Sequence, residues 1–172
     1  MRRIRYSVAI SLDGFIAGPN EEIDWITNDP EVDFAAIWEQ FDTLLMGRLT
    51  YDLATKKRGK NAFAGKTTIV FSRTLDPRDH PAVTVISDLK LEWLQALLAR
   101  SGKDVWLFGG GALFRSFLDQ GLVDTVEVNI IPVVLGAGLP MLPPPYTPTK
   151  LHLMSHKVYR SGRVALVYEV QR

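Results

Sequence analysis

The segment from Val105 to Phe114 constrains the fold more than any other part of the chain. Four apolar residues run into three consecutive glycines, Gly109 to Gly111, and apolar residues at helical spacing follow. This order predicts a buried strand that turns directly into a helix. Glycine lets a ligand approach the backbone without meeting a Cβ atom, and a helix N-terminus presents free amide groups to an anion. The segment therefore favours phosphate binding, and the alternative is a tight turn that binds nothing.

Two further predicted strand ends carry groups that suit a phosphate. Residues 43–46 predict a short buried strand, which Gly47 and Arg48 turn into a helix, and the next strand along the chain ends in Ser72 and Arg73. Arginine binds phosphate through a planar fork and keeps its charge, although each arginine taken alone is more often a solvated surface residue. Because the carboxyl ends of parallel strands line the ligand crevice, one cofactor with several phosphates would account for all three strand ends. The two arginines favour NADP over NAD.

Strands and helices alternate along most of the chain. Alternating apolar residues predict a first strand over residues 4–12, and Asp29-Pro30 predicts a helix that begins with Asp29 as its N-cap. A later helix start is predicted at Asp88, ahead of leucines at helical spacing. The basic stretch from Lys56 to Lys66, which is broken by glycine and asparagine, is expected to be a loop.

The C-terminal part of the chain has a different pattern. Residues 151–159 and 163–170 flank an Arg-Ser-Gly turn signal, which predicts an antiparallel hairpin. Five prolines between residues 135 and 148 exclude regular structure there. We therefore expect one α/β domain over residues 1–172, with a mostly parallel central sheet, helices on both faces and a C-terminal antiparallel hairpin.

Composition excludes several classes of function. The chain has no cysteine, which excludes disulfides, thiolate nucleophiles and Cys-ligated zinc, and its net charge of +1 gives no broad field for nucleic acid or an anionic membrane. His152 and His156 are expected to lie on one strand face about 13 Å apart, too far to share a metal, so we expect no metal site. No apolar run is long enough to span a bilayer, and polar residues interrupt the stretch after the basic start, so we expect a cytoplasmic protein.

The order of these motifs resembles that of a known superfamily. Residues 46–51, 70–73 and 108–111 (M-G-R-L-T-Y, V-F-S-R and F-G-G-G) occur in the order found in dihydrofolate reductases. Residues 11–17 (S-L-D-G-F-I-A) and 121–124 (G-L-V-D) are more similar to the reductase domain of the riboflavin-pathway deaminase/reductase. This resemblance covers almost the whole chain. It implies a dihydrofolate reductase-like three-layer fold and an NADPH-dependent reductase.

The resemblance also implies which residues hold NADPH. Gly47, Arg48 and Thr50 would bind the pyrophosphate and the adenosine-side phosphate, and Ser72 and Arg73 would hold the 2′-phosphate and adenine. The first two glycines of the triple-glycine segment would be joined by a cis peptide. The other implied residues are Ala9 and Ile16 at the nicotinamide, and Phe108, Gly109, Gly110, Gly111, Ala112 and Leu113 along the cofactor diphosphate.

The residue that assists protonation is less well defined by the resemblance. Dihydrofolate reductases carry an acid at a helix start after a Pro-Trp pair. Here Trp25 is present, but the aligned acid position falls at Pro30, so either of its neighbours, Asp29 or Glu31, could serve. Asp13 is a further candidate for catalysis or substrate binding, because it ends the strand beside the predicted nicotinamide. The alternative is that Asp13 only caps the Asp-Gly turn.

One principal hypothesis follows, with two alternatives. The chain is predicted to transfer hydride from NADPH to a small pteridine- or pyrimidine-like heterocycle. It could instead be a true dihydrofolate reductase, or a nucleotide-binding protein without turnover. Phe15 stands where the riboflavin branch often has lysine, so the substrate is not identified. Riboflavin-branch reductases tend to dimerise, and the apolar run 123–134 with the hairpin predicts an apolar edge for a homodimer, unless that edge is covered within the monomer.

Overall fold

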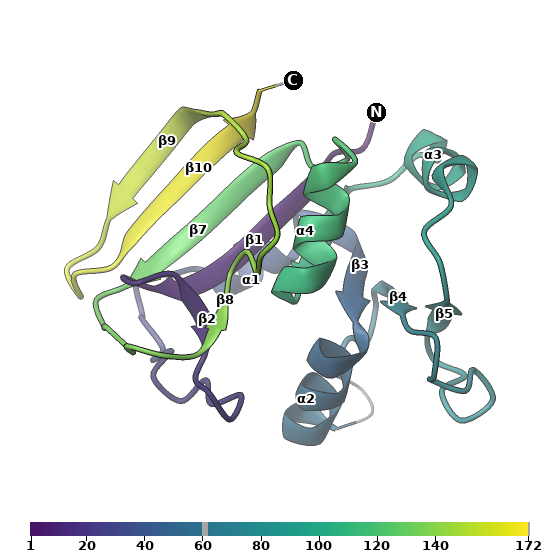
Figure 1. The fold of residues 1–172 in the computed structure, drawn as a ribbon, viewed down its shortest axis with the longest axis horizontal. Coiled ribbons are helices and arrows are strands. Elements are labelled where there is room, and N and C mark those ends of the chain that lie inside the picture. Colours follow the sequence, from purple (N-terminus) through teal and green to yellow (C-terminus); the bar gives the residue numbers. More distant parts are fainter. Residues whose placement is uncertain (60–61, 172) are drawn as a thin grey trace.

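Segments rich in β-branched residues form strands, and the amphipathic segments between them form helices, in a computed structural model that describes residues 1–59 and 62–171 (Figure 1). The helices are α1 (Phe34–Trp38), α2 (Arg48–Arg58), α3 (Leu91–Ala99) and α4 (Gly111–Asp119). The strands are β1 (Ile4–Ser11), β2 (Phe15–Ala17), β3 (Phe41–Gly47), β4 (Thr67–Phe71), β5 (Thr84–Ile86), β6 (Asp104–Gly109), β7 (Thr125–Ile131), β8 (Leu139–Pro140), β9 (Leu151–Val158) and β10 (Val164–Val170).

One large sheet organises the molecule. Its eight strands lie in the order β5-β4-β3-β6-β1-β7-β10-β9, and β2 and β8 form a separate two-stranded sheet. All neighbours from β5 to β7 are parallel, whereas β10 is antiparallel to both β7 and β9. This topology confirms the predicted mostly parallel sheet with an antiparallel C-terminal hairpin.

Helices cover both faces of this sheet. On one face, Phe114 and Phe117 of α4 and Leu94 of α3 belong to the larger buried core. On the other face, Tyr51 of α2 and Trp38 of α1 pack with a second buried cluster. The longest helix of the described residues, α2, has 11 residues, and none of these helices is long and apolar enough to cross a bilayer.

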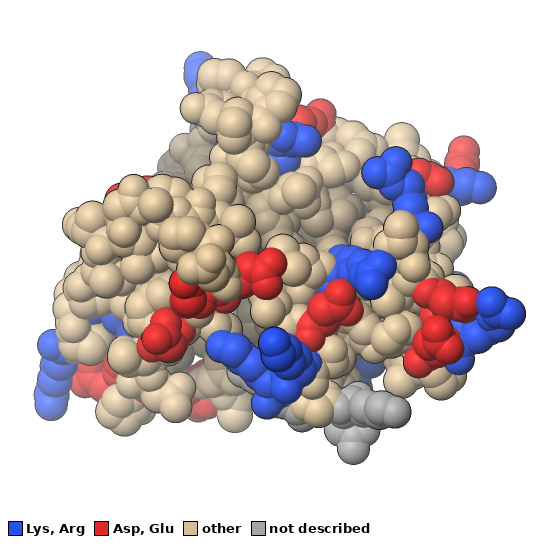
Figure 2. Space-filling view, turned by 60° about the horizontal axis from the view of Figure 1, so that its bottom comes forward, with Lys and Arg blue, Asp and Glu red and all other residues tan. Residues whose placement is uncertain are grey.

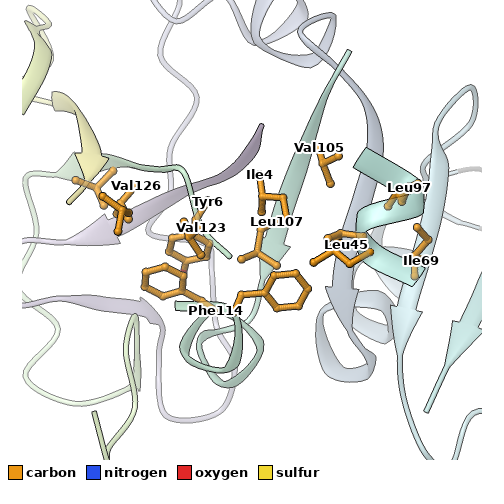
Figure 3. Packing of buried hydrophobic residues seen from close by; sticks show 14 of the residues in the cluster. Ile4, Tyr6, Leu45, Ile69, Leu97, Val105, Leu107, Phe114, Val123 and Val126 are labelled. Carbon is orange, nitrogen blue, oxygen red and sulfur yellow. The ribbon is translucent and has the colours of Figure 1, made fainter. Parts of the chain in front are cut away.

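Tyr6 of β1 lies in the larger core and fixes α4 on the sheet. Its ring stacks on that of Phe114, with the centroids 3.7 Å apart and an interplanar angle of 4°, and the side chains of Ile4 and Leu107 lie close by (Figure 3). The Tyr6 hydroxyl is buried and has no hydrogen-bond partner among the described residues. Burial raises the pKa of this phenol. The stacked ring therefore stabilises the core, while its hydroxyl opposes that stabilisation.

Two segments contain more regular structure than the sequence predicts. The proline-rich stretch 135–148 includes β8, which pairs with β2 through Phe15 and Pro140 and through Ala17 and Leu139. A two-residue strand at a sheet edge tolerates proline, because the N–H that proline lacks is not needed there for a hydrogen bond between strands. Helix α2 also extends to Arg58, so the expected loop begins later, and residues 60 and 61 of that loop lie outside the described residues.

Both predicted aspartate caps are wrong. Helix α1 begins after Asp33, which lies four residues beyond the predicted N-cap Asp29. The Asp33 side chain accepts a hydrogen bond from the backbone N–H of Ala36. Helix α3 begins after Lys90 rather than at Asp88, without a side-chain cap. Aspartate also stabilises turns through hydrogen bonds to nearby backbone groups, as Asp29 does by accepting from the N–H of Glu31, and this competing role accounts for the shift of the first helix start.

A bulge changes the faces on which two histidines lie. His156 of β9 is opposite Leu166 of β10, and His152 is opposite Glu169, with a register shift between the two pairs. Leu166 and Glu169 are three residues apart, so their side chains point to opposite faces of the sheet, and so do the histidines. The prediction that His152 and His156 share one face is therefore wrong.

We expect Tyr6→Phe to stabilise the protein by about 1 kcal/mol, because it keeps the stacked ring and removes an unsatisfied buried hydroxyl. Urea unfolding at neutral pH measures the change. Tyr51→Phe is the matched control, since the Tyr51 hydroxyl lies 3.0 Å from Nδ1 of His80 and its loss should destabilise the protein. A loss of stability in Tyr6→Phe would contradict the unpartnered hydroxyl.

Candidate cofactor and active site

Three neighbouring strands end at one edge of the sheet. The last residue of β3, Gly47, pairs with the last residue of β4, Phe71, and Met46 pairs with Gly109, the last residue of β6. The residues that follow these strands therefore lie side by side, although they are far apart in the sequence. This arrangement brings together the three phosphate-friendly strand ends found in the sequence.

Glycines bring β3 and β6 into close contact at this edge. A Cβ atom on Gly47 would lie 3.9 Å from the carbonyl oxygen of Gly109 and 4.0 Å from the nitrogen of Gly110. A Cβ atom on Gly110 would lie 3.5 Å from Oγ1 of Thr50 and 3.8 Å from Cδ1 of Ile16. The Gly109–Gly110 peptide is cis, as the resemblance implied. Five residues predicted to bind the cofactor are thus neighbours in space.

Helices α2 and α4 both begin at this point. Their N-caps are Gly47 and Gly110, and neither of these described residues supplies a capping side chain. The first turn of each helix also contains no acidic residue. The free backbone N–H groups and the positive dipole ends of two helices therefore converge on one place, which suits an anion.

The ends of β3 and β4 are joined by side chains. Arg48 donates from its guanidinium to Oγ1 of Thr74 at 2.5 Å and to the carboxylate of Asp52 at 3.2 Å. The Ser72 hydroxyl accepts hydrogen bonds from two backbone N–H groups of the turn that follows it, at 3.0 and 3.2 Å. Arg73 is exposed, and Arg48 keeps about half of its side chain in solvent. Both guanidinium groups are thus accessible at the edge where the helices begin.

The surface around this edge has no single sign of charge. Seen with the bottom of Figure 1 turned forward, acidic and basic side chains lie next to one another (Figure 2). Attraction of a phosphate must therefore come from individual groups at short range rather than from a broad positive field.

The rest of the triple-glycine segment lies between the sheet and the β8 strand. A Cβ atom on Gly111 would lie 2.6 Å from the carbonyl oxygen of Pro140, so only glycine fits there. The Phe108 ring packs edge-on against Phe63, with the centroids 5.9 Å apart. Ala112 is exposed and Leu113 is half-buried against the larger core. These contacts hold the segment in place without covering the start of α4 with a side-chain cap.

Asp13 fastens a loop to the end of β1. Its carboxylate accepts hydrogen bonds from the backbone N–H groups of Leu135 at 3.1 Å and Gly136 at 2.7 Å. A hydrogen bond with Ser11, together with these backbone bonds, lowers the pKa of Asp13 to about 2. The side chain is therefore an ionised acceptor at neutral pH. Its predicted role in catalysis stays a hypothesis beside this anchoring role.

Asp29 and Glu31 both bind the turn between β9 and β10. Asp29 accepts a hydrogen bond from the Ser161 hydroxyl and lies 3.8 Å from Nε of Arg163, with both charged side chains almost fully buried. The bond from Ser161 is the main reason that the pKa of Asp29 is lowered. Glu31 accepts from the backbone N–H of Arg160 at 2.9 Å. These contacts attach the segment before α1 to the hairpin, and a part in proton transfer stays a prediction.

Sequence reasoning missed two groups that contact or pair with β1, the strand that carries Ala9. Asn129 lies directly opposite Ala9 in the neighbouring strand β7, and its Oδ1 atom is buried without a hydrogen-bond partner among the described residues. The Trp106 indole donates to the carbonyl oxygen of Ser7 at 2.8 Å and faces the Phe34 ring at 6.2 Å. An asparagine within an otherwise strand-forming run, V-E-V-N-I-I, was the signal that could have revealed the first of these groups.

Comparison with known proteins identifies the fold and the family. Dihydrofolate reductase from Enterococcus faecalis, in a complex with NADP(H), matches with a TM-score of 0.68 and 16% identity over 99% of this chain and 97% of that one, so the fold is dihydrofolate reductase-like. The family model of the RibD C-terminal domain matches residues 2–166, and the chain belongs to that family. Both findings confirm the resemblance seen in the sequence.

Individual relatives agree with this assignment. YyaP, an uncharacterized protein of Bacillus subtilis (strain 168), is 38% identical over 178 residues, which cover 97% of this chain and 94% of YyaP. The crystal structure of a protein from Shewanella sp. PV-4 that is assigned to riboflavin biosynthesis has a TM-score of 0.82 and 27% identity, and each chain is covered completely. The chain is therefore similar along its whole length to a protein assigned to riboflavin biosynthesis.

Acid should weaken the protein partly through Asp13. Its pKa is about 2 when folded against 3.8 ordinarily, so its contribution to stability is complete above about pH 4 and is lost as the pH falls toward 2. We expect Asp13→Asn to have a lower thermal midpoint than the wild type at neutral pH. On acidification, the midpoint of the variant should fall less than that of the wild type. Thermal melts across this pH range measure both. The exposed Asp24, changed to Asn, is the control, and equal curves for Asp13→Asn and wild type would contradict the anchoring role.

Proposed function

We propose that this protein is an NADPH-dependent reductase that transfers hydride to a small pteridine- or pyrimidine-like heterocycle. The observation that carries the proposal is the close approach of two helix N-termini, at Gly47 and Gly110, that have no side-chain cap. Membership of the RibD C-terminal domain family supports it. A true dihydrofolate reductase, or a nucleotide-binding protein without turnover, remains the alternative function.

The residues at the sheet edge fit such a dinucleotide. The N–H groups at the starts of α2 and α4 would bind the diphosphate, with Gly47 and Gly110 leaving room for close approach of the backbone. Arg48 follows β3, where it would bind the pyrophosphate and the adenosine-side phosphate, and Ser72 and Arg73 follow the neighbouring strand β4, where they would hold the 2′-phosphate and adenine. Ile16 lies near Gly110, since its Cδ1 atom would be 3.8 Å from a Cβ atom placed on that glycine, and Ala9 lies in β1, the strand next to β6.

Hydride transfer requires position and exclusion of water more than covalent chemistry from the protein. NADPH, when bound, would supply the hydride. Ala9 and Ile16 would shape the nicotinamide end through small and branched apolar side chains. Asp29 and Glu31 are the candidates for assisting protonation, and Asp13 is the candidate for substrate binding or another polar role in catalysis. Asp29 and Glu31 are held by the hairpin, and Asp13 is held by the 135–136 loop.

Titration with NADPH tests the proposal directly. Binding would be followed by protein fluorescence and by thermal shift, and NADPH oxidation would be followed with dihydrofolate and with a ribosylaminopyrimidine as separate substrates. Turnover of the pyrimidine alone supports the riboflavin-branch reductase, and turnover of dihydrofolate supports the alternative enzyme. Binding of NADPH without turnover of either substrate supports a nucleotide-binding protein. No binding of NADPH at all rejects it as the cofactor. A cytoplasmic location is part of the proposal, and cell fractionation tests it.

Replacing Arg48 and Arg73 by alanine should weaken NADPH binding roughly tenfold or more while changing NADH binding much less, because a guanidinium–phosphate bond is charge-assisted and NADH has no 2′-phosphate. Isothermal titration with both cofactors gives the two ratios. Arg100→Ala, at the end of α3, is the control for loss of a surface arginine. An equal loss for NADPH and NADH would defeat the 2′-phosphate assignment.

We also infer a homodimer that forms through the edge strand β9. All eight residues of β9 are exposed, and four of them are large and apolar. No helix of the described residues lies over β9 and β10 (Figure 1). A long edge strand with apolar side chains is a template for pairing with another chain, and a second copy would cover it symmetrically. The apolar residues are Leu151, Leu153, Met154 and Val158, which are 40–67% exposed.

Leu153→Glu should convert the dimer into a monomer, because a charge would then be buried in the apolar contact. Size-exclusion chromatography with light scattering measures the mass in solution. Leu91→Glu on α3 is the matched control, since Leu91 is exposed to a similar degree. A monomeric wild type, or a dimer that is equally resistant to both substitutions, would reject β9 as the interface.

A further inference from the structure

A pocket lies at the edge of the sheet opposite to the candidate cofactor site. Strands β1 and β6 begin there and helix α3 ends there, near the N-terminus of the chain and far from α2 (Figure 1). The pocket has a volume of about 710 Å³ and is open to solvent. None of the described residues that line it is among those predicted to bind NADPH or to take part in catalysis. The proposed reductase activity therefore leaves this pocket without a role.

Arg2 lines this pocket with a buried guanidinium group. Its side chain is only 6% exposed. Nε donates to the carbonyl oxygen of Lys103 at 2.6 Å, and Nη2 donates to Asp42 and to Oγ1 of Thr43. The remaining terminal nitrogen, Nη1, has no hydrogen-bond partner among the described residues. Because the donors of a buried group are nearly always paired, Nη1 indicates an acceptor that the described residues do not supply.

The turn after α3 holds this guanidinium in place. A Cβ atom on Gly102 would lie 3.3 Å from both Cζ and Nε of Arg2, so the glycine backbone packs directly on the guanidinium. Asp42 joins the two segments, because it accepts from Arg2 and also from the backbone N–H of Lys103 at 2.8 Å. The guanidinium is thus fixed before any ligand binds, which lowers the entropic cost of binding.

Most other cations at this edge already have carboxylate partners. Arg5 donates to Glu127 and Asp104, and Lys103 donates to Glu39 at 2.9 Å. Asp104 is the only carboxylate among the described residues that line the pocket, and it also accepts from a backbone N–H at 2.9 Å. The negative charge of Asp104 is therefore already engaged and does not neutralise a further cation.

Arg100 differs from these cations. It is exposed where α3 ends, it lines the pocket, and it forms no ion pair or side-chain hydrogen bond with the part of the chain that the structure describes. The neighbouring Ser101 adds an exposed hydroxyl, and Leu98 and Ala99 add apolar surface. Positive charge beside a short apolar stretch suits a small organic anion.

We propose that this pocket binds a small organic anion through a phosphate or carboxylate group. Nη1 of Arg2 donates to the oxyanion from the wall of the pocket, and Arg100 supplies a second guanidinium whose charge is not neutralised. The partial negative charge at the C-terminal end of α3 opposes an anion, so the attraction comes from these charge-assisted hydrogen bonds. The site lies apart from the cofactor edge, and it does not depend on the proposed reductase activity.

Inorganic phosphate and acetate are the probes for this site. Their binding would be followed by NMR titration at constant ionic strength, with the protein saturated with NADP⁺ so that the cofactor edge is filled, and again without cofactor. We expect saturable shifts of the backbone N–H signals of Gly102 and Lys103 and of the Nε–H signal of Arg2. The probe that binds more tightly identifies the group that the pocket prefers. Arg100→Ala should weaken binding roughly tenfold, and Arg100→Glu should abolish it.

Arg160→Ala is the matched control. Arg160 is 94% exposed in the hairpin turn at the opposite edge of the sheet, so its loss should leave the affinity unchanged. Circular dichroism shows whether each variant is folded. Saturable shifts at the pocket of a protein that does not bind NADP⁺ would reject the reductase but keep this site. The same shifts on addition of chloride alone, no saturable shift with either probe, or equal affinity in Arg100→Ala and the wild type would overturn the assignment.

Discussion

The register between β3 and β6 is the constraint on which the site depends. Met46 lies level with Gly109, and this pairing places Gly47 against the Gly109–Gly110 peptide. Because a helix begins directly after each strand, the same register sets two helix N-termini side by side. A shift of one residue would turn the strand side chains to the opposite face and separate the two turns. The anion site is thus a consequence of strand pairing rather than of any single loop.

Packing on both faces holds this register in place. On one face the stacked rings of Tyr6 and Phe114 join β1 to α4, so that the start of α4 cannot move independently of the sheet. On the other face Trp106 of β6 packs on Phe41 of β3, with ring centroids 4.9 Å apart. On one face, packing therefore holds α4 against β1, and on the other face it holds β6 against β3. A site built on such elements needs little reorganisation when a ligand binds.

The carboxylates illustrate where local sequence patterns are insufficient. Asp29 and Glu31 were singled out because they flank the acid position that the resemblance implies, and Asp13 because it ends a strand. Each of the three lies in the structure against a segment that is distant in the sequence. Glu31 and Asp29 meet the hairpin turn at residues 160–163, and Asp13 meets the loop at 135–136. A side chain that accepts a hydrogen bond across more than a hundred residues leaves no periodic signal. The bulge that separates the faces of His152 and His156 is equally invisible, since it depends on how β9 meets β10.

The sequence alone determined the alternation of strands and helices, the hairpin, the glycine turns and the resemblance to the reductase family, because these depend on side-chain periodicity and on residues with special backbone freedom. Only the tertiary structure decided which strand ends are neighbours, since strand order is set by long-range pairing. It also decided that Asn129 lacks a partner while the nearby acids have theirs. A buried polar atom without a hydrogen-bond partner can be recognised only in the packed chain, because the positions of all its neighbours must be known first.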